Sequence, residues 1–262
     1  MKDLRIEYYR WGIRRVLHLG IPERWTELSI PQMEFASQLH LCGVKEEELL
    51  DIMCGIKHGM ISQLEPIQRY VILQNLEWCH TLDRPVDTFI IHRIPGTRLV
   101  SPGRKLRGCS LQQFMTIDTY FQQFTLHPNQ ERWLNLFVAA IYMRKDEIFY
   151  EENGKHPSGK IRAVDVGRNI ATIERCSLPI RFAVYINFLL IRVWLSKSYP
   201  FLFPPPEDAP TDTHHATKPT DWLAVFDAFI GDDVANMRTY QMMAATDAFR
   251  IMNRRIRNAQ KR

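Results

Sequence analysis

The stretch that comes closest to a catalytic motif is Gly154–Lys160, which has the GxxxxGK spacing of a phosphate-binding loop. In such loops backbone N–H groups hold the phosphates, and a Ser or Thr directly after the lysine binds magnesium. Ile161 stands at that position, and residues 146–153 are too polar for the buried strand that should precede the loop. A second partial match, Gly103–Gly108, lacks the lysine. We therefore predict no cofactor-binding residues.

Other residue types that could do chemistry are also incompletely arranged. His214 and His215 are adjacent, which does not suit two metal ligands on one helix face. Asp232 and Asp233 follow Gly231 and could hold a cation, but this pattern is typical of a turn that begins a helix. Local signatures of metalloproteases, serine hydrolases and zinc deaminases are missing from the sequence. We predict no catalytic and no metal residues and a protein that is not an enzyme, although a triad of distant residues would leave no local signature.

The cysteines favour a reducing compartment. They are odd in number, are scattered and form no CxxC pair, which argues against a disulfide framework or a zinc site. The five positions are Cys42, Cys54, Cys79, Cys109 and Cys176. We interpret them as buried thiols of a cytoplasmic protein.

The sharpest charge feature is the end of the chain. After Asp247 there is no acidic residue, and Arg250, Arg254 and Arg257 are spaced to form one cationic stripe on a helix. The stripe can be a solvated helix end, a contact for an acidic protein or a contact for nucleic acid. Nucleic acid is the weaker of the two partner readings, because Phe249 is the only aromatic residue available there to stack on bases. The candidate partner-binding residues are Arg250, Arg254, Arg255, Arg257, Phe249 and Trp222. A basic loop, from Arg93 through Arg107, could join the same surface.

Composition indicates a folded protein of one or two domains. The chain has 262 residues, 45% of them apolar, with a formal charge of +5. Its charged N-terminus does not read as a signal peptide. Leu178–Leu195 is the most apolar stretch, but Arg181, Asn187 and Arg192 interrupt it, so we expect a buried core helix and no membrane association.

Hydrophobic spacing, caps and glycines predict mostly helices. The expected helices cover Leu4–Leu19, Pro31–Cys42, Glu46–Cys54, Ser62 to about Cys79, the residues after Ser110, those after Pro128, Ile161–Arg175, the residues from Pro179, Asp221–Ile230 and about Tyr240–Gln260. Thr88–His92 and Arg98–Val100 have strand character and predict the one small β-hairpin. The expected fold is mainly α, with a bundle-like main domain at 1–203, a proline-rich linker or loop at 204–220, and a C-terminal helical segment at 221–262 with a basic end.

Several short phrases resemble a protein group found in tailed phages and prophages. They are Ile21–Leu28 followed by Gln32, Cys109–Phe114, Leu136–Tyr142, Tyr199–Phe203 and Asp221–Leu223. The group consists of poorly characterised helical proteins from structural modules, encoded near tail-tube and tape-measure genes. The resemblance implies a virion structural protein or tail assembly protein, either a tail or connector component or a tail assembly chaperone, with no catalytic residues.

The expected mode of action is therefore protein–protein docking, with other virion or tail proteins and with further copies of itself as partners. The expected location is the host cytoplasm during assembly, and then the virion. The alternative is a nucleic-acid-binding accessory protein that uses the basic C-terminal helix.

Overall fold

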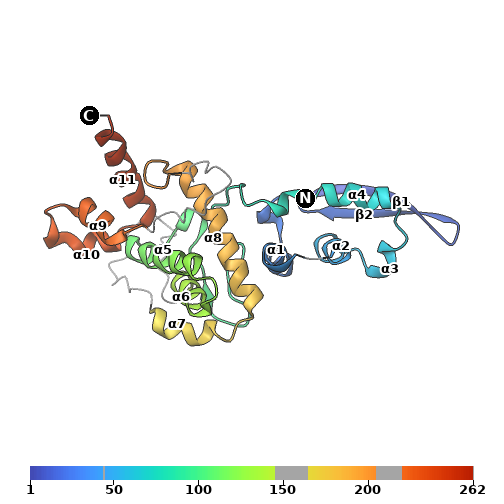
Figure 1. The fold of residues 1–262 in the computed structure, drawn as a ribbon, viewed down its shortest axis with the longest axis horizontal. Coiled ribbons are helices and arrows are strands. Elements are labelled where there is room, and N and C mark those ends of the chain that lie inside the picture. The colour runs from blue at the N-terminus through green and yellow to red at the C-terminus, as the bar shows by residue number, and fades with distance from the viewer. Residues whose placement is uncertain (44, 145–164, 205–219, 262) are drawn as a thin grey trace, which may run out of the picture.

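The computed structural model describes residues 1–43, 45–144, 165–204 and 220–261, and it confirms a mainly α-helical fold with small antiparallel sheets. The molecule is elongated (Figure 1). One end holds a β-hairpin at residues 2–21 with the helices of residues 46–74, and the other end holds the helices of residues 222–259. Helices α1 (Ile30–Cys42) and α8 (Leu178–Ser198) pack against each other between the two ends.

The N-terminal segment is a β-hairpin, so the helix predicted for Leu4–Leu19 is wrong. Strands β1 (Lys2–Arg10) and β2 (Ile13–Ile21) pair along their whole length. Alternate residues on one face, among them Ile6, Tyr8 and Leu19, are buried against the helices. The apolar residues fit a period of two as well as a helical period, and the turn at Gly12 selects the hairpin.

The next elements cover the inner face of this hairpin. Helix α1 (Ile30–Cys42) begins at Ser29, whose hydroxyl and Gln32 form a capping box, and α2 (Glu46–Cys54) ends at Gly55, as predicted. Helix α3 (His58–Ile61) is a single turn. Helix α4 (Pro66–Gln74) begins later and ends earlier than predicted, because Glu65 forms its cap with Gln68 while the Ser62 hydroxyl bonds to the Gly59 carbonyl.

The hairpin predicted at 88–100 is not formed, because buried side chains take the hydrogen bonds that its first strand would need. The Asn187 amide bonds to the Ile90 N–H at 2.6 Å and to the Thr88 carbonyl at 3.1 Å, and the Tyr142 hydroxyl donates to the Ile91 carbonyl. The second predicted strand exists as β3 (Leu99–Val100), but it pairs with β4 (Met143–Arg144). A single bridge between Arg93 and Val100 is what remains of the predicted pairing.

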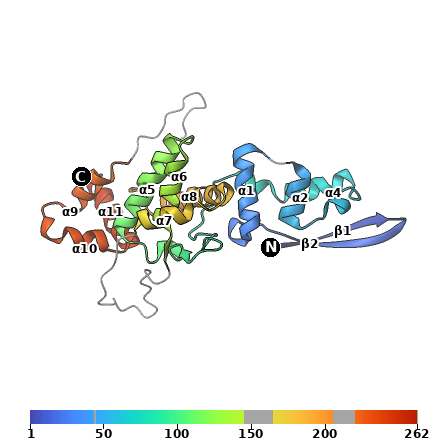
Figure 2. The ribbon, with the colours of Figure 1, turned by 90° about the horizontal axis from the view of Figure 1, so that it is seen from below.

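Three long helices form the centre of the larger end. Helices α5 (Leu111–Leu126) and α6 (Glu131–Ile141) pack side by side, and α8 (Leu178–Ser198) crosses them (Figure 2). Phe188 of α8 lies among the rings of Phe114, Phe121 and Phe137. By length and composition α8 could span a membrane, and half of its most apolar window is buried inside the protein. Helix α7 (Val166–Ile173) packs against α6 and corresponds to the helix predicted for Ile161–Arg175. The first residues of that prediction, 161–164, lie outside the described residues.

The C-terminal helices pack on α5. Helix α9 (Trp222–Ile230) is followed by α10 (Met237–Met242) and α11 (Ala245–Ala259), so the single helix predicted for about Tyr240–Gln260 is interrupted. The interruption lets residues 243–245 pair with the segment before α5: the Leu111 N–H donates to the Met243 carbonyl and the Ala245 N–H to the Cys109 carbonyl. Most of the predicted linker, residues 205–219, lies outside the described residues, so the boundaries at 203 and 220 stay a prediction.

Candidate docking surfaces

The cationic stripe predicted at the C-terminus lies on the exposed face of α11. Arg250, Arg254 and Arg257 are all exposed. Arg250 forms an ion pair with Asp247 one turn earlier, at 3.1 Å, and in the described part of the chain neither Arg254 nor Arg257 has a carboxylate within ion-pair distance. Two cations therefore remain for a partner at the very end of the molecule.

Arg255 has a structural role that its spacing did not reveal. Its guanidinium donates to the Phe229 carbonyl at 2.6 Å and lies over the Phe229 ring at 5.4 Å. The Asn253 side chain accepts hydrogen bonds from the N–H groups of Phe201 and Leu202. These contacts attach α11 to α9 and to the segment that follows α8, so the helix that carries the stripe is anchored to the rest of the protein.

Phe249 and Trp222 are core residues, which corrects their expected role as partner contacts. Phe249 is 0% exposed and packs edge-to-face on Phe114, with ring centroids 4.6 Å apart. Trp222 is 4% exposed and packs on Phe114 and Phe203. Sequence spacing shows which face of a helix is apolar, but it does not show whether that face meets the core or a partner.

The buried carboxylate of Asp118 explains how the last helices are attached. Its oxygens accept hydrogen bonds from the Trp222 indole, from Gln122 and from Arg192. The Arg192 guanidinium also lies over the Phe121 ring at 5.3 Å. The carboxylate is thus fully used in joining α5, α8 and α9, and no local sequence signal could have shown it.

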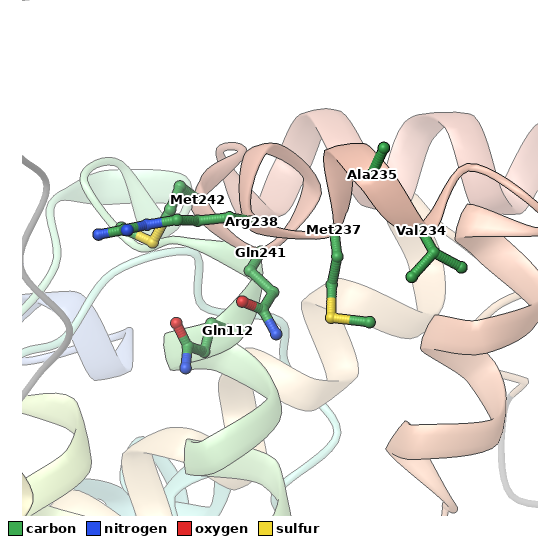
Figure 3. A pocket seen from close by; sticks show the side chains of 7 residues that line it. All are labelled: Gln112, Val234, Ala235, Met237, Arg238, Gln241 and Met242. Carbon is green, nitrogen blue, oxygen red and sulfur yellow. The ribbon is translucent and has the colours of Figure 1, made fainter.

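An open pocket of about 470 Å³ lies at the same end of the molecule, between α10 and the start of α5 (Figure 3). The amides of Gln112 and Gln241 face each other across it, and the Met237 side chain hangs down beside them. Its lining is completed by Val234, Ala235, Arg238 and Met242. Val234 and Met237 are exposed, and methionine side chains adapt readily to apolar partners.

The 3₁₀ turn η3 (Arg104–Leu106) packs against α11, so part of the predicted basic loop does lie near the C-terminal helix.

The opposite end of the molecule carries a surface that the sequence reading missed. The tip of the β1–β2 hairpin reaches beyond the helices (Figures 1 and 2). It exposes Tyr9, Trp11 and Ile13 together with Arg10 and Arg15. On the helix predicted for Leu4–Leu19 these side chains would point in different directions, whereas the hairpin turn brings them close together.

The loop at Gly103–Gly108 is closed by its own backbone hydrogen bonds. The N–H groups of Gly103 and Arg107 bond to each other's carbonyls, and the Lys105 N–H bonds to the Asp87 carbonyl. These three N–H groups are therefore already used within the protein and do not point to a phosphate. The other near match, Gly154–Lys160, and the His214–His215 pair lie outside the described residues.

The remaining chemical candidates have ordinary structural roles. Asp233 accepts hydrogen bonds from Asn236 at 3.0 Å and from the Tyr240 hydroxyl at 2.8 Å, as in a turn that begins a helix. Burial raises the pKa of the Cys54 and Cys79 thiols to about 12, which suppresses the thiolate that a nucleophile needs. Within the described ranges no group of three or more His, Cys, Asp or Glu residues could hold a metal.

Comparisons with protein-family models, curated proteins and solved structures found no significant match to this chain.

Proposed function

We propose that this chain is a non-enzymatic virion structural protein or tail assembly protein of a phage-like particle, a tail or connector component or a tail assembly chaperone. The observation that carries the proposal is the elongated shape of the molecule (Figure 1), with exposed apolar and basic residues at each of its ends. Such a shape suits a protein that contacts neighbours in an assembly. The phage character rests on the short sequence segments that resemble helical proteins of tailed-phage structural modules, such as Ile21–Leu28 and Cys109–Phe114.

The C-terminal end is the protein-docking surface in this proposal. The pocket supplies the apolar contacts of Val234 and Met237, and the amides of Gln112 and Gln241 supply hydrogen bonds. Arg238 in the pocket lining is exposed and provides positive charge, and the exposed Arg254 and Arg257 of α11 add to it at the same end of the molecule, which favours an acidic partner surface. An apolar centre with a polar, charged rim is the usual composition of a protein interface.

The alternative, nucleic-acid binding by α11, has less support. Phe249 was the only aromatic residue available to stack on bases, and it is buried against Phe114. The face of α11 that remains exposed carries arginines without an aromatic platform. This composition favours an acidic protein over a nucleic-acid strand.

Sedimentation velocity over about 1 to about 100 µM protein tests self-association through this surface. We expect the sedimentation coefficient to rise with concentration for the wild type. The rise should disappear when Met237→Glu places a charge in the pocket, and it should weaken in the double variant Arg254→Glu/Arg257→Glu. The matched control Lys57→Glu, an exposed charge reversal near the other end, should behave as wild type. A wild-type protein that stays monomeric throughout the range would contradict docking between copies.

A further inference from the structure

The hairpin tip, residues Tyr9–Arg15, is a tight turn with exposed aromatic and basic side chains. The strands are joined by the two residues Trp11 and Gly12, and Arg10 pairs with Ile13 to close the turn. Both turn residues have positive φ, 53° and 75°, as in the type I′ turns that join hairpin strands. The tip is free of the helices that cover the rest of the hairpin (Figure 2).

Trp11 is an unfavourable residue for its position. The first residue of such a turn is normally Asn, Asp or Gly, because other side chains are strained at positive φ. The Trp11 side chain is 84% exposed, so it gains little from burial in return. A strained and exposed aromatic residue without a packing role is a sign of a binding function.

The charges around Trp11 define the chemistry of its partner. The Arg10 guanidinium lies over the indole ring, 4.7 Å from its centroid. The register places Arg10 and Arg15 on the same face as diagonal neighbours, and in the described part of the chain neither has a carboxylate within ion-pair distance. Arg14, on the other face, is paired with Glu7. From Tyr8 to Leu17 the chain contains no acidic residue.

We propose that the hairpin tip binds single-stranded nucleic acid, with Trp11 stacked on an unpaired base and with Arg10 and Arg15 contacting the neighbouring phosphates. Aromatic side chains interleaved with arginines are how sequence-tolerant single-strand binders hold a strand. The α11 stripe lacks this combination, whereas the hairpin tip has it. A single strand is required because only an unpaired base exposes its face to an indole without being unstacked from a duplex.

Fluorescence anisotropy with a labelled oligothymidine of about 20 nucleotides tests the proposal. We expect Trp11→Asn to weaken binding at least about tenfold, because stacking is lost. Asn suits positive φ, so the melting temperature of this variant should stay the same or rise. Trp11→Phe keeps a ring and should retain most of the affinity. This combination separates a binding role from a folding role.

The double variant Arg10→Gln/Arg15→Gln tests the phosphate contacts through salt. Between about 50 and about 200 mM NaCl, the slope of log affinity against log salt should decrease in magnitude by about 1.4, or about 0.7 for each arginine. The matched control Arg132→Gln/Arg175→Gln changes two exposed arginines that belong neither to the hairpin tip nor to the C-terminal docking surface, and it should bind the strand as wild type does.

Three results would overturn the proposal. The first is undiminished binding by Trp11→Asn, and the second is an equal loss in the control Arg132→Gln/Arg175→Gln. The third is tighter binding to a duplex of the same length, or binding only to vesicles of equal parts phosphatidylcholine and phosphatidylglycerol, which would assign the tip to duplex or membrane. Because the C-terminal surface is tested by sedimentation with different variants, failure here and failure of the proposed function are distinguishable.

Discussion

The Trp222 indole donates a hydrogen bond to the Asp118 carboxylate at 2.8 Å, although 104 residues separate the two in the chain. This bond joins the first residue of α9 to the middle of α5. Arg192 of α8 pairs with the same carboxylate, so three helices meet at one buried charge. This buried polar network therefore anchors α9, which is part of the C-terminal end, to α5 and α8.

Removing that carboxylate should destabilise the protein strongly. Asp118 is 1% exposed, and Asp118→Ala leaves the Arg192 guanidinium and the Trp222 N–H without their acceptor. We expect the free energy of unfolding in urea to fall by about 3 to 5 kcal/mol. The exposed control Asp232→Ala should change it by less than about 0.5 kcal/mol. A loss below about 1 kcal/mol for Asp118→Ala would show that the network contributes little.

A second prediction concerns the buried end of α6, whose last carbonyls are satisfied by side chains. Asn169 donates to the carbonyls of Tyr142 and Ala139, and Gln113 donates to those of Ala140 and Ile141. Asn169→Ala leaves the Tyr142 carbonyl unpaired in the interior and should cost about 2 kcal/mol of unfolding free energy. Equal stability of Asn169→Ala and the exposed control Asn258→Ala would contradict this assignment.

His40 should make the stability depend on pH. Burial lowers its pKa below the ordinary value of 6.5, and its ring nitrogen Nε2 lies 3.0 Å from the Cys79 carbonyl oxygen. Because the unfolded chain takes up this proton near 6.5 and the folded protein takes it up only at lower pH, stability is complete above 6.5 and falls as the pH decreases below it. His40→Gln keeps a donor but does not titrate.

Thermal melts at about pH 7 and about pH 5 measure this dependence. The decrease in melting temperature between the two should be smaller for His40→Gln than for the wild type. The exposed control His18→Gln should retain the full decrease. Identical decreases in the wild type and His40→Gln would show that another group is responsible.

The fold class could be read from the sequence because most helices carry their own start and stop signals. Ser29 and Gly55 act as their residue types predict. Pattern alone failed where two periods fit the same residues, as in the N-terminal hairpin. It also failed at 88–92, where the strand propensity is real but Asn187, almost a hundred residues later, takes the backbone hydrogen bonds.

The candidate site was predictable only in part, for a related reason. Spacing correctly placed Arg250, Arg254 and Arg257 on one exposed face of a helix. It could not show that Phe249 faces the core, or that Arg255 is engaged by Phe229. The hairpin tip was missed because Trp11 stands at a turn position where aromatic residues are not expected.

The central claim, that the protein acts by docking through its C-terminal end, is tested most directly by hydrogen–deuterium exchange at low and at high protein concentration. We predict that association slows exchange at residues 234–242, around the pocket, and at residues 250–257 of α11, and that Met237→Glu abolishes this protection. Exchange that is unchanged at both segments while the protein associates would contradict the claim.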